Sequence, residues 1–286
     1  MSREAVEVTE PLWPTGAVMQ AGFVGRRTGR APRAARSLEP MTGPLLLPLL
    51  GLAVTVLVGA LAQRSTGMGF ALLSAPFLVL VLGPFEGILV TNLCGALSSA
   101  LNLAAQRHDV DWPRAAVLVP MGVVGVIPGA VAVSLIPEAP LMVTVSAVVI
   151  AGLALTLLLR GRTLPRSQSL GAVGGLASGF MNVTAGVGGP GVVIYARATG
   201  WPHRQFAATA QLQFLVLSIV SLLAKRALPT LPPVSWAVLV LALLTGTIVG
   251  SWLGPRIPPE RAMRIVMVLA VAGSLLALVR GLVLLG

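Results

Sequence analysis

Long apolar runs separated by short polar connections dominate the chain from Pro44 onward. Each run is close to the roughly 20 residues that an α-helix needs to cross about 30 Å of hydrocarbon. The pattern therefore predicts an all-α polytopic integral membrane protein with about eight transmembrane helices. The predicted spans cover residues 44–64, 86–106, 114–136, 140–160, 169–184, 205–224, 235–254 and 263–284.

Two further apolar pieces, 69–82 and 188–199, are too short to cross a membrane alone. Each begins in a glycine-rich turn and ends near Gly-Pro or Gly-Trp-Pro. These features predict a short half-helix or re-entrant segment in each part of the chain.

The chain also repeats itself. A shift of 119 residues places amide on amide, hydroxyl on hydroxyl and glycine on glycine, and a shift of 121 superposes later glycines. We therefore expect two homologous four-span halves, 44–160 and 169–286, joined by a linker over 161–168; duplicated halves are frequent in transporters. The matched positions are Gln63/Asn182, Ser65/Thr184, Gly67/Gly186, Gly69/Gly188, Asn92/Gln211, Ser99/Ser218, Gly125/Gly246, Gly129/Gly250 and Gly152/Gly273.

Composition agrees with a membrane protein. Of the 286 residues, 56% are hydrophobic and 10% are charged, whereas a soluble domain carries about 25% charged residues. The single cysteine, Cys94, excludes an intrachain disulfide and a thiolate metal cluster. The two histidines, His108 and His203, fall in predicted loops without metal-ligand spacing. We therefore expect no metal site and no cofactor.

The net charge of +11 sits in the connections between apolar segments, where membrane proteins carry lysine and arginine. Aromatic residues make up 5% of the chain, too few for base stacking, so nucleic acid is not expected as a partner. The positive-inside rule places the N-terminus and the central linker, with Arg160, Arg162 and Arg166, on the cytoplasmic side of the plasma membrane. That arrangement requires an even number of crossings per half; Arg256, Arg261 and Arg264 would then fall outside and count against it.

Residues 1–43 differ from the rest, with six arginines, four glutamates and no long apolar run. One interpretation is a basic, disordered cytoplasmic tail. A second is that translation starts at Met41, directly before the first apolar run. A third is a functional tail that binds anionic lipid or a partner.

Two groups of closely spaced glycines interrupt the apolar segments. Such glycines break a helix and let the backbone approach a ligand. The free N–H groups and dipole of a half-helix that starts there favour an anion. Two breaks facing each other near the midplane would form one small anion site. The glycines assigned to it are Gly67, Gly69, Gly186, Gly188 and Gly189.

Polar residues beside the breaks complete the candidate site. Gln63, Ser65, Asn182 and Thr184 are expected to orient the anion. Arg64 either faces the cavity and attracts the anion or extends to the membrane surface. Two amides inside apolar spans, in contrast, either face the substrate path or bond a neighbouring helix; they are Asn92 and Gln211.

The glycines of the later spans, Gly125, Gly129, Gly246 and Gly250, are assigned instead to close helix packing. The acidic residues all fall at span ends or in loops, so a carboxylate-lined cation or proton pathway is disfavoured.

The duplicated halves, the Gly67-Met-Gly69 break and the motif from Asn182 through Gly186, Gly188 and Gly189 to Pro190 resemble the TauE/SafE sulfite exporter family, also called the toluene sulfonate uptake permease family. The resemblance covers about residues 44–284. It implies transport of small sulfur-containing anions such as sulfite or organosulfonates.

Together these features predict a secondary permease for a small anion, because the chain contains no P-loop for ATP. One alternative is an intramembrane enzyme acting on a lipid phosphate or a peptide, which would need an acid–base pair. The other is a non-transporting scaffold in which the glycines only pack helices. The sequence leaves both a monomer and a homo-oligomer open.

Overall fold

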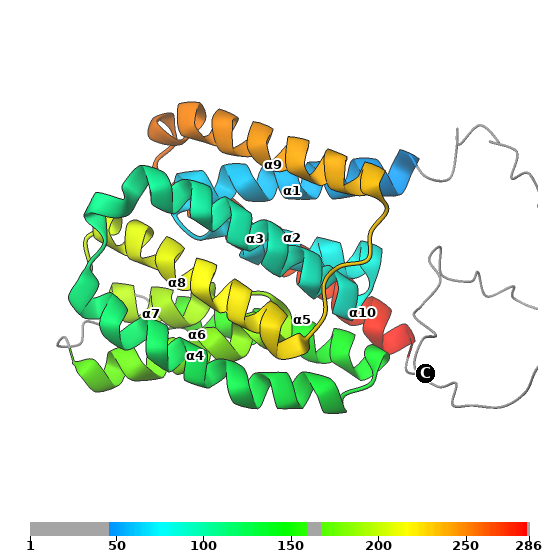
Figure 1. Cartoon of the computed structure of the whole chain (residues 1–286), viewed down its shortest axis with the longest axis horizontal. Helices are drawn as coiled ribbons and strands as arrows, with labels where there is room; N and C mark the ends of the chain where they lie inside the picture. The colour runs from blue at the N-terminus through cyan, green and yellow to red at the C-terminus, as the bar shows by residue number, and fades with distance from the viewer. Residues whose placement is uncertain (1–45, 159–166, 285–286) are drawn as a thin grey trace, which may run out of the picture. The chain divides into compact units, whose positions relative to one another are not determined.

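The structure is a computed structural model that describes residues 46–158 and 167–284. Within these ranges the chain forms ten α-helices and two 3₁₀ turns (Figure 1). The predicted tail 1–43 and most of the predicted linker 161–168 lie outside the described residues. The helices are α1 (Leu46–Thr66), α2 (Gly69–Leu82), α3 (Pro84–Gln106), α4 (Trp112–Leu135), α5 (Glu138–Leu158), α6 (Gln168–Ala185), α7 (Gly189–Ala198), α8 (His203–Lys225), α9 (Pro233–Leu253) and α10 (Pro259–Val283).

Seven of the described helices are long and apolar enough to cross a membrane: α1, α3, α4, α5, α8, α9 and α10. The eighth predicted span, 169–184, corresponds to α6 and is not among them. Its 18 residues include four glycines and several polar side chains, which lower its apolar character. Large apolar side chains such as Ile127, Ile248 and Val268 remain exposed on α4, α9 and α10, as expected for surfaces that face lipid.

The two predicted helix breaks are present, and each turns the chain back on itself. Gly67 ends α1 with φ 82° and Gly186 ends α6 with φ 72°, a left-handed conformation that glycine adopts without strain. Short helices follow, α2 and α7, which pack against the helices that precede them. Helix pairs α1–α2 and α6–α7 are therefore hairpins.

The glycines assigned to packing lie where helices from the two parts of the chain touch. A Cβ on Gly246 would collide with the Leu57 carbonyl oxygen, and one on Gly250 would lie 3.0 Å from Leu61 Cα, so α9 runs parallel to α1. Glycine at these positions therefore permits backbone contact between helices.

The same contact recurs between α4 and α6. A Cβ on Gly125 would collide with the Leu176 carbonyl oxygen, and one on Gly129 would lie 3.1 Å from the Phe180 carbonyl oxygen. Helices α4 and α6 are therefore also parallel and in backbone contact, and the sequence-based assignment of all four glycines to helix packing is confirmed.

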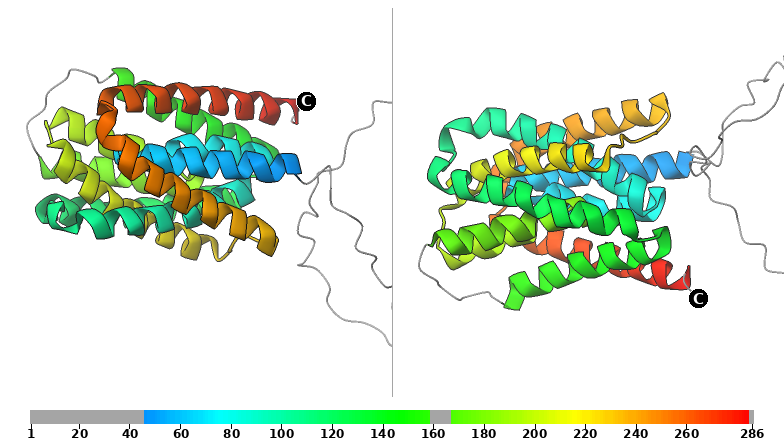
Figure 2. Two further views of the ribbon diagram at one scale, coloured as in Figure 1. Left: turned by 90° about the horizontal axis from the view of Figure 1, so that it is seen from above. Right: turned by 60° about the horizontal axis from the view of Figure 1, so that its bottom comes forward.

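Helix directions define two ends of the bundle (Figures 1 and 2). Helix α1 starts and α10 ends at one end, which we call the terminal end; α5 ends and α6 starts at the opposite end, which we call the linker end. The structure thus differs from the expectation that the N-terminus and the linker share a side. The short helix α2 reverses the direction of the chain, so the first half contains five successive antiparallel helices, α1 to α5, instead of four. An odd number of helices places the end of α5 at the end of the bundle opposite the start of α1.

Candidate functional site

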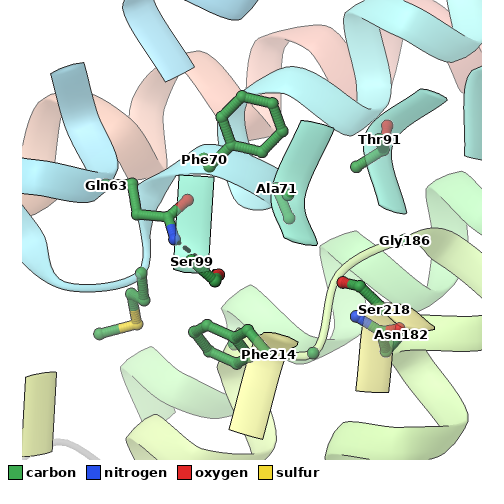
Figure 3. A pocket seen from close by; sticks show the side chains of 13 residues that line it. Gln63, Phe70, Ala71, Thr91, Ser99, Asn182, Gly186, Phe214 and Ser218 are labelled. Carbon is green, nitrogen blue, oxygen red and sulfur yellow. Dashed lines mark hydrogen bonds between the residues drawn. The ribbon is translucent and has the colours of Figure 1, made fainter. Parts of the chain in front are cut away.

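A small cavity lies between the two helix breaks, with a volume of about 20 Å³, enough for roughly one water molecule. Its walls come from both hairpins and from the long helices α3 and α8 (Figure 3). The lining residues are Gln63, Met68, Phe70, Ala71, Thr91, Gly95, Ser99, Asn182, Gly186, Gly188, Gly189, Phe214 and Ser218.

A hydrogen-bonded amide pair supports the first break. Gln63 Nε2 donates to Ser99 Oγ at 3.0 Å and to Gln211 Oε1 at 2.6 Å, and Gln211 Nε2 donates to the carbonyl oxygen of Gly67 at 2.7 Å. All three polar side chains are at least 98% buried. The network joins the end of α1 to α3 and α8, so Gln211 holds the break in place from behind the cavity wall.

Asn182 supplies the corresponding amide at the second break, with one hydrogen bond. Its Oδ1 accepts from Ser221 Oγ at 2.7 Å. Figure 3 shows its carboxamide beside the Ser218 hydroxyl, near Gly186. Because Asn182 lines the cavity and its oxygen is engaged by Ser221, its N–H groups are the donors that remain for a ligand.

The glycines of the second break expose backbone to the cavity. The first N–H groups of α7 have no intrahelical acceptor, and Pro190 at the second helical position has no N–H to leave unpaired. Ser178 Oγ donates to the carbonyl oxygen of Gly188 at 2.7 Å, which anchors the break to α6. A Cβ on Gly188 would lie 3.0 Å from Ser178 Oγ, whereas one on Gly189 would meet only Leu72 and Met68 at 3.4 Å or more. Gly188 is therefore closely packed, while Gly189 has room beside it.

Several predicted site residues lie outside the cavity. The hydroxyls of Ser65 and Thr184 donate to carbonyl oxygens of their own helices, at Leu61 and Phe180. A Cβ on Gly69 would lie 2.8 Å from Ala62, so this glycine permits contact between α1 and α2. These three residues shape the hairpins, and the structure does not bring them to the lining.

Arg64 and Asn92 also lie away from the lining. Arg64 Nη1 donates to Asn102 Oδ1 at 3.3 Å, which ties α1 to α3. Asn92 is 1% exposed and neither of its polar side-chain atoms has a partner. Gly67 contributes through its carbonyl oxygen to the amide network rather than to the lining.

Sequence reasoning missed part of the lining. Ser99 and Ser218 face the cavity from α3 and α8, and the repeat had already paired them, although they were not assigned to the site. The sequence also gives no signal for Thr91, Gly95, Phe70 and Phe214. In an apolar helix, the local sequence does not show which face of the helix lines a cavity.

The cavity wall offers hydrogen-bond donors and no negative charge. No aspartate or glutamate lines it, and within residues 46–158 and 167–284 no group of three or more His, Cys, Asp or Glu side chains has the placement of a metal site. Backbone N–H groups, an amide and hydroxyls around a small desolvated space favour an anion.

The chain matches a known family over most of its length. The model of a family described as sulfite exporter TauE/SafE matches residues 51–278, a range that includes both helix breaks and the whole cavity lining. No curated protein and no solved structure matches the chain.

Proposed function

Because the chain belongs to the sulfite exporter TauE/SafE family, we propose that it is a secondary membrane permease for a small sulfur oxyanion, of the sulfite or organosulfonate class. The observation that carries this proposal is the cavity between the two breaks, which is lined by N–H and O–H donors and by no carboxylate. The cavity is its substrate site, with the Asn182 amide and the backbone of Gly188 and Gly189 as the principal donors and Gln63 as the opposing amide. Gly186 shapes the wall, because its own N–H donates to the Asn182 carbonyl oxygen at 2.8 Å.

The cavity volume bears on the transport cycle. Room for about one water molecule is too little for a four-atom oxyanion. Binding therefore requires the hairpins to separate, as happens when one bundle moves against another around a central site. In such a cycle, a cavity of this size would belong to a closed state.

We further propose that α1–α5 and α6–α10 are inverted repeats. Helix α6 runs opposite to α1, and the contacts of the packing glycines support the relation: Gly246 meets Leu57 while Gly125 meets Leu176. The shifts of the repeat relate these two contacts: a shift of 121 residues takes Gly125 to Gly246, and a shift of 119 takes Leu57 to Leu176.

The charges favour a cytoplasmic linker end. Among the described residues, the terminal end carries Lys225, Arg226 and Arg280, whereas the linker end carries more than twice as many cations. We infer that the linker end faces the cytoplasm and that α1 starts outside, the reverse of the orientation expected from the basic tail. The cations at the linker end are Arg64, Arg107, Arg114, Arg197, Arg204, Arg256, Arg261 and Arg264.

Cysteine labelling tests this orientation. In a Cys94→Ala background, we expect Leu228→Cys, exposed at the terminal end, to react with a membrane-impermeant maleimide on intact cells. His108→Cys, exposed at the linker end, should react only after permeabilisation. The opposite labelling pattern would reverse the orientation, and labelling of both from one side would contradict the helix directions.

Flux measurement tests the function. Protein reconstituted in proteoliposomes should move labelled sulfite down an imposed gradient, and unlabelled organosulfonates should compete if they share the site. Protein-free vesicles provide the control. Reconstituted, folded protein that moves no sulfur oxyanion would favour the non-transporting scaffold, and turnover of a lipid or peptide would favour the enzyme.

A further inference from the structure

A second, larger pocket opens at the linker end and shares one lining residue with the cavity. This outer pocket has a volume of about 230 Å³ and is lined by Thr66, Met68, Arg197, Trp201, His203 and Phe206, among others. Met68 lines both the outer pocket and the cavity. It is the residue between Gly67 and Gly69 in the first break.

Met68 is placed to close the cavity. Its side chain is 6% exposed, and its Sδ lies 3.8 Å from the position that a Cβ on Gly189 would occupy. The thioether therefore reaches from the first break to the second. Methionine is unbranched and flexible, so its side chain can change rotamer while the backbone of the break stays in place.

The outer pocket carries positive charge. Arg197 is exposed and lines both this pocket and a neighbouring one of about 670 Å³, to which Arg264 also contributes. No aspartate or glutamate lines either pocket. Arg204, at the same end, differs because its Nε pairs with Asp109 Oδ2 at 2.7 Å, so its charge is already matched.

We propose that the outer pocket is the site at which the anion is captured from the linker end, and that Met68 is the movable barrier between this pocket and the substrate cavity. This inference rests on the proposed function and extends it to a route. The pocket has room for a small oxyanion with part of its hydration shell, since one water takes about 30 Å³ of liquid volume. Arg197 attracts the anion, and rotation of the Met68 side chain opens the path to the donors of the second break when the hairpins separate.

Accessibility of a reporter cysteine tests the barrier without any transport measurement. In a Cys94→Ala background, Ser99→Cys places a thiol on the cavity wall. An anionic methanethiosulfonate reagent is then applied from the linker end, with Met68 intact or replaced. We expect Met68→Ala to raise the modification rate about tenfold or more, the order expected when the burial energy of one methionine side chain no longer holds the path shut.

Two variants serve as controls. Met68→Leu keeps the volume and should leave the rate near that of Met68. Val187→Ala removes bulk at the position that the 119-residue shift pairs with Met68, and it should not raise the rate from the linker end. A rate unchanged by Met68→Ala, in protein with normal thermal stability, would overturn the barrier, as would an equal rise in all three variants. If Met68→Ala is unstable, Met68→Ser and Met68→Val provide the same comparison.

Transport kinetics test the capture site. We expect Arg197→Gln to raise the KM for sulfite several-fold with little change in the maximal rate, while the control Arg204→Gln leaves both near wild type. Equal effects of the two variants would overturn the assignment. Absence of sulfite flux in the unaltered protein would instead refute the proposed function, and the cysteine accessibility result would still decide whether Met68 closes the cavity.

Discussion

Asn182→Asp should abolish anion flux while leaving folded protein in the membrane. The side chains of the two residues have nearly the same shape, and the aspartate keeps an oxygen that can accept from Ser221 Oγ, now 2.7 Å from Asn182 Oδ1. The substitution replaces cavity-facing N–H donors with a negative charge. Two like charges 4 Å apart repel by about 4 kcal/mol at an effective dielectric constant of 20, which corresponds to about a thousandfold loss of affinity. Sulfite flux and thermal stability would be measured on the same preparation.

Matched variants separate this effect from a general loss of structure. Asn102→Asp introduces the same charge into the same bundle, but its side chain faces Arg64 Nη1, which is 3.3 Å away, and it does not line the cavity; we expect flux to persist. Asn182→Ala removes the donor without adding charge and should reduce flux less than Asn182→Asp. Full flux in a stable Asn182→Asp protein would refute the cavity as the anion site.

The helix breaks were predictable because closely spaced glycines have few physical uses inside an apolar segment. Gly67 and Gly186 adopt positive φ values, and Gly246 and Gly250 permit backbone contact; in each case the absence of a side chain is what the fold requires. Because the role of these glycines depends on having no side chain, their spacing in the sequence is enough to identify them.

Side-chain partners were less predictable. The hydroxyls of Ser65 and Thr184 donate to carbonyl oxygens one helical turn away. A serine or threonine in a helix can bond its own backbone instead of a ligand, and the spacing of polar residues does not reveal which partner it takes. Whether Gln211 faces substrate or a neighbour depended on the packing of α8 against α1, which brings it to Gln63. The cavity-facing role of Ser99 likewise depends on tertiary contacts.

The topology was misjudged for a different reason. Counting charges placed the basic tail and the central linker on one side, and this required an even number of passes. Helix α2 has 14 residues and α7 has 10, and the sequence predicts both as half-helices or re-entrant segments that do not count as passes. In the structure each forms the second arm of a hairpin and reverses the direction of the chain. The odd count that results places the linker opposite the start of α1 and makes an inverted repeat geometrically possible.

Gly246→Ala and Gly125→Ala should each cost the protein much of its stability, and by similar amounts. A Cβ at either position would collide with a carbonyl oxygen, of Leu57 or of Leu176. A side chain can relieve such a collision by changing its rotamer, but the backbone of a neighbouring helix cannot, so the two helices must move apart. Overpacking of this kind costs about 1–3 kcal/mol and sometimes more. Folded yield after membrane extraction and the midpoint of thermal unfolding would measure the effect.

Gly51→Ala is the control, because it adds the same methyl group on α1 with nothing within 4 Å of the new Cβ. It should be neutral or slightly stabilising, since alanine exceeds glycine in helix propensity by about 1 kcal/mol. The comparison also tests the repeat. If α1–α9 and α6–α4 are equivalent contacts, the losses at Gly246 and Gly125 should match, and each should exceed the effect at Gly51. A large loss at one glycine with none at the other would show that the two contacts differ in strength, and the proposed equivalence of the two halves would then fail.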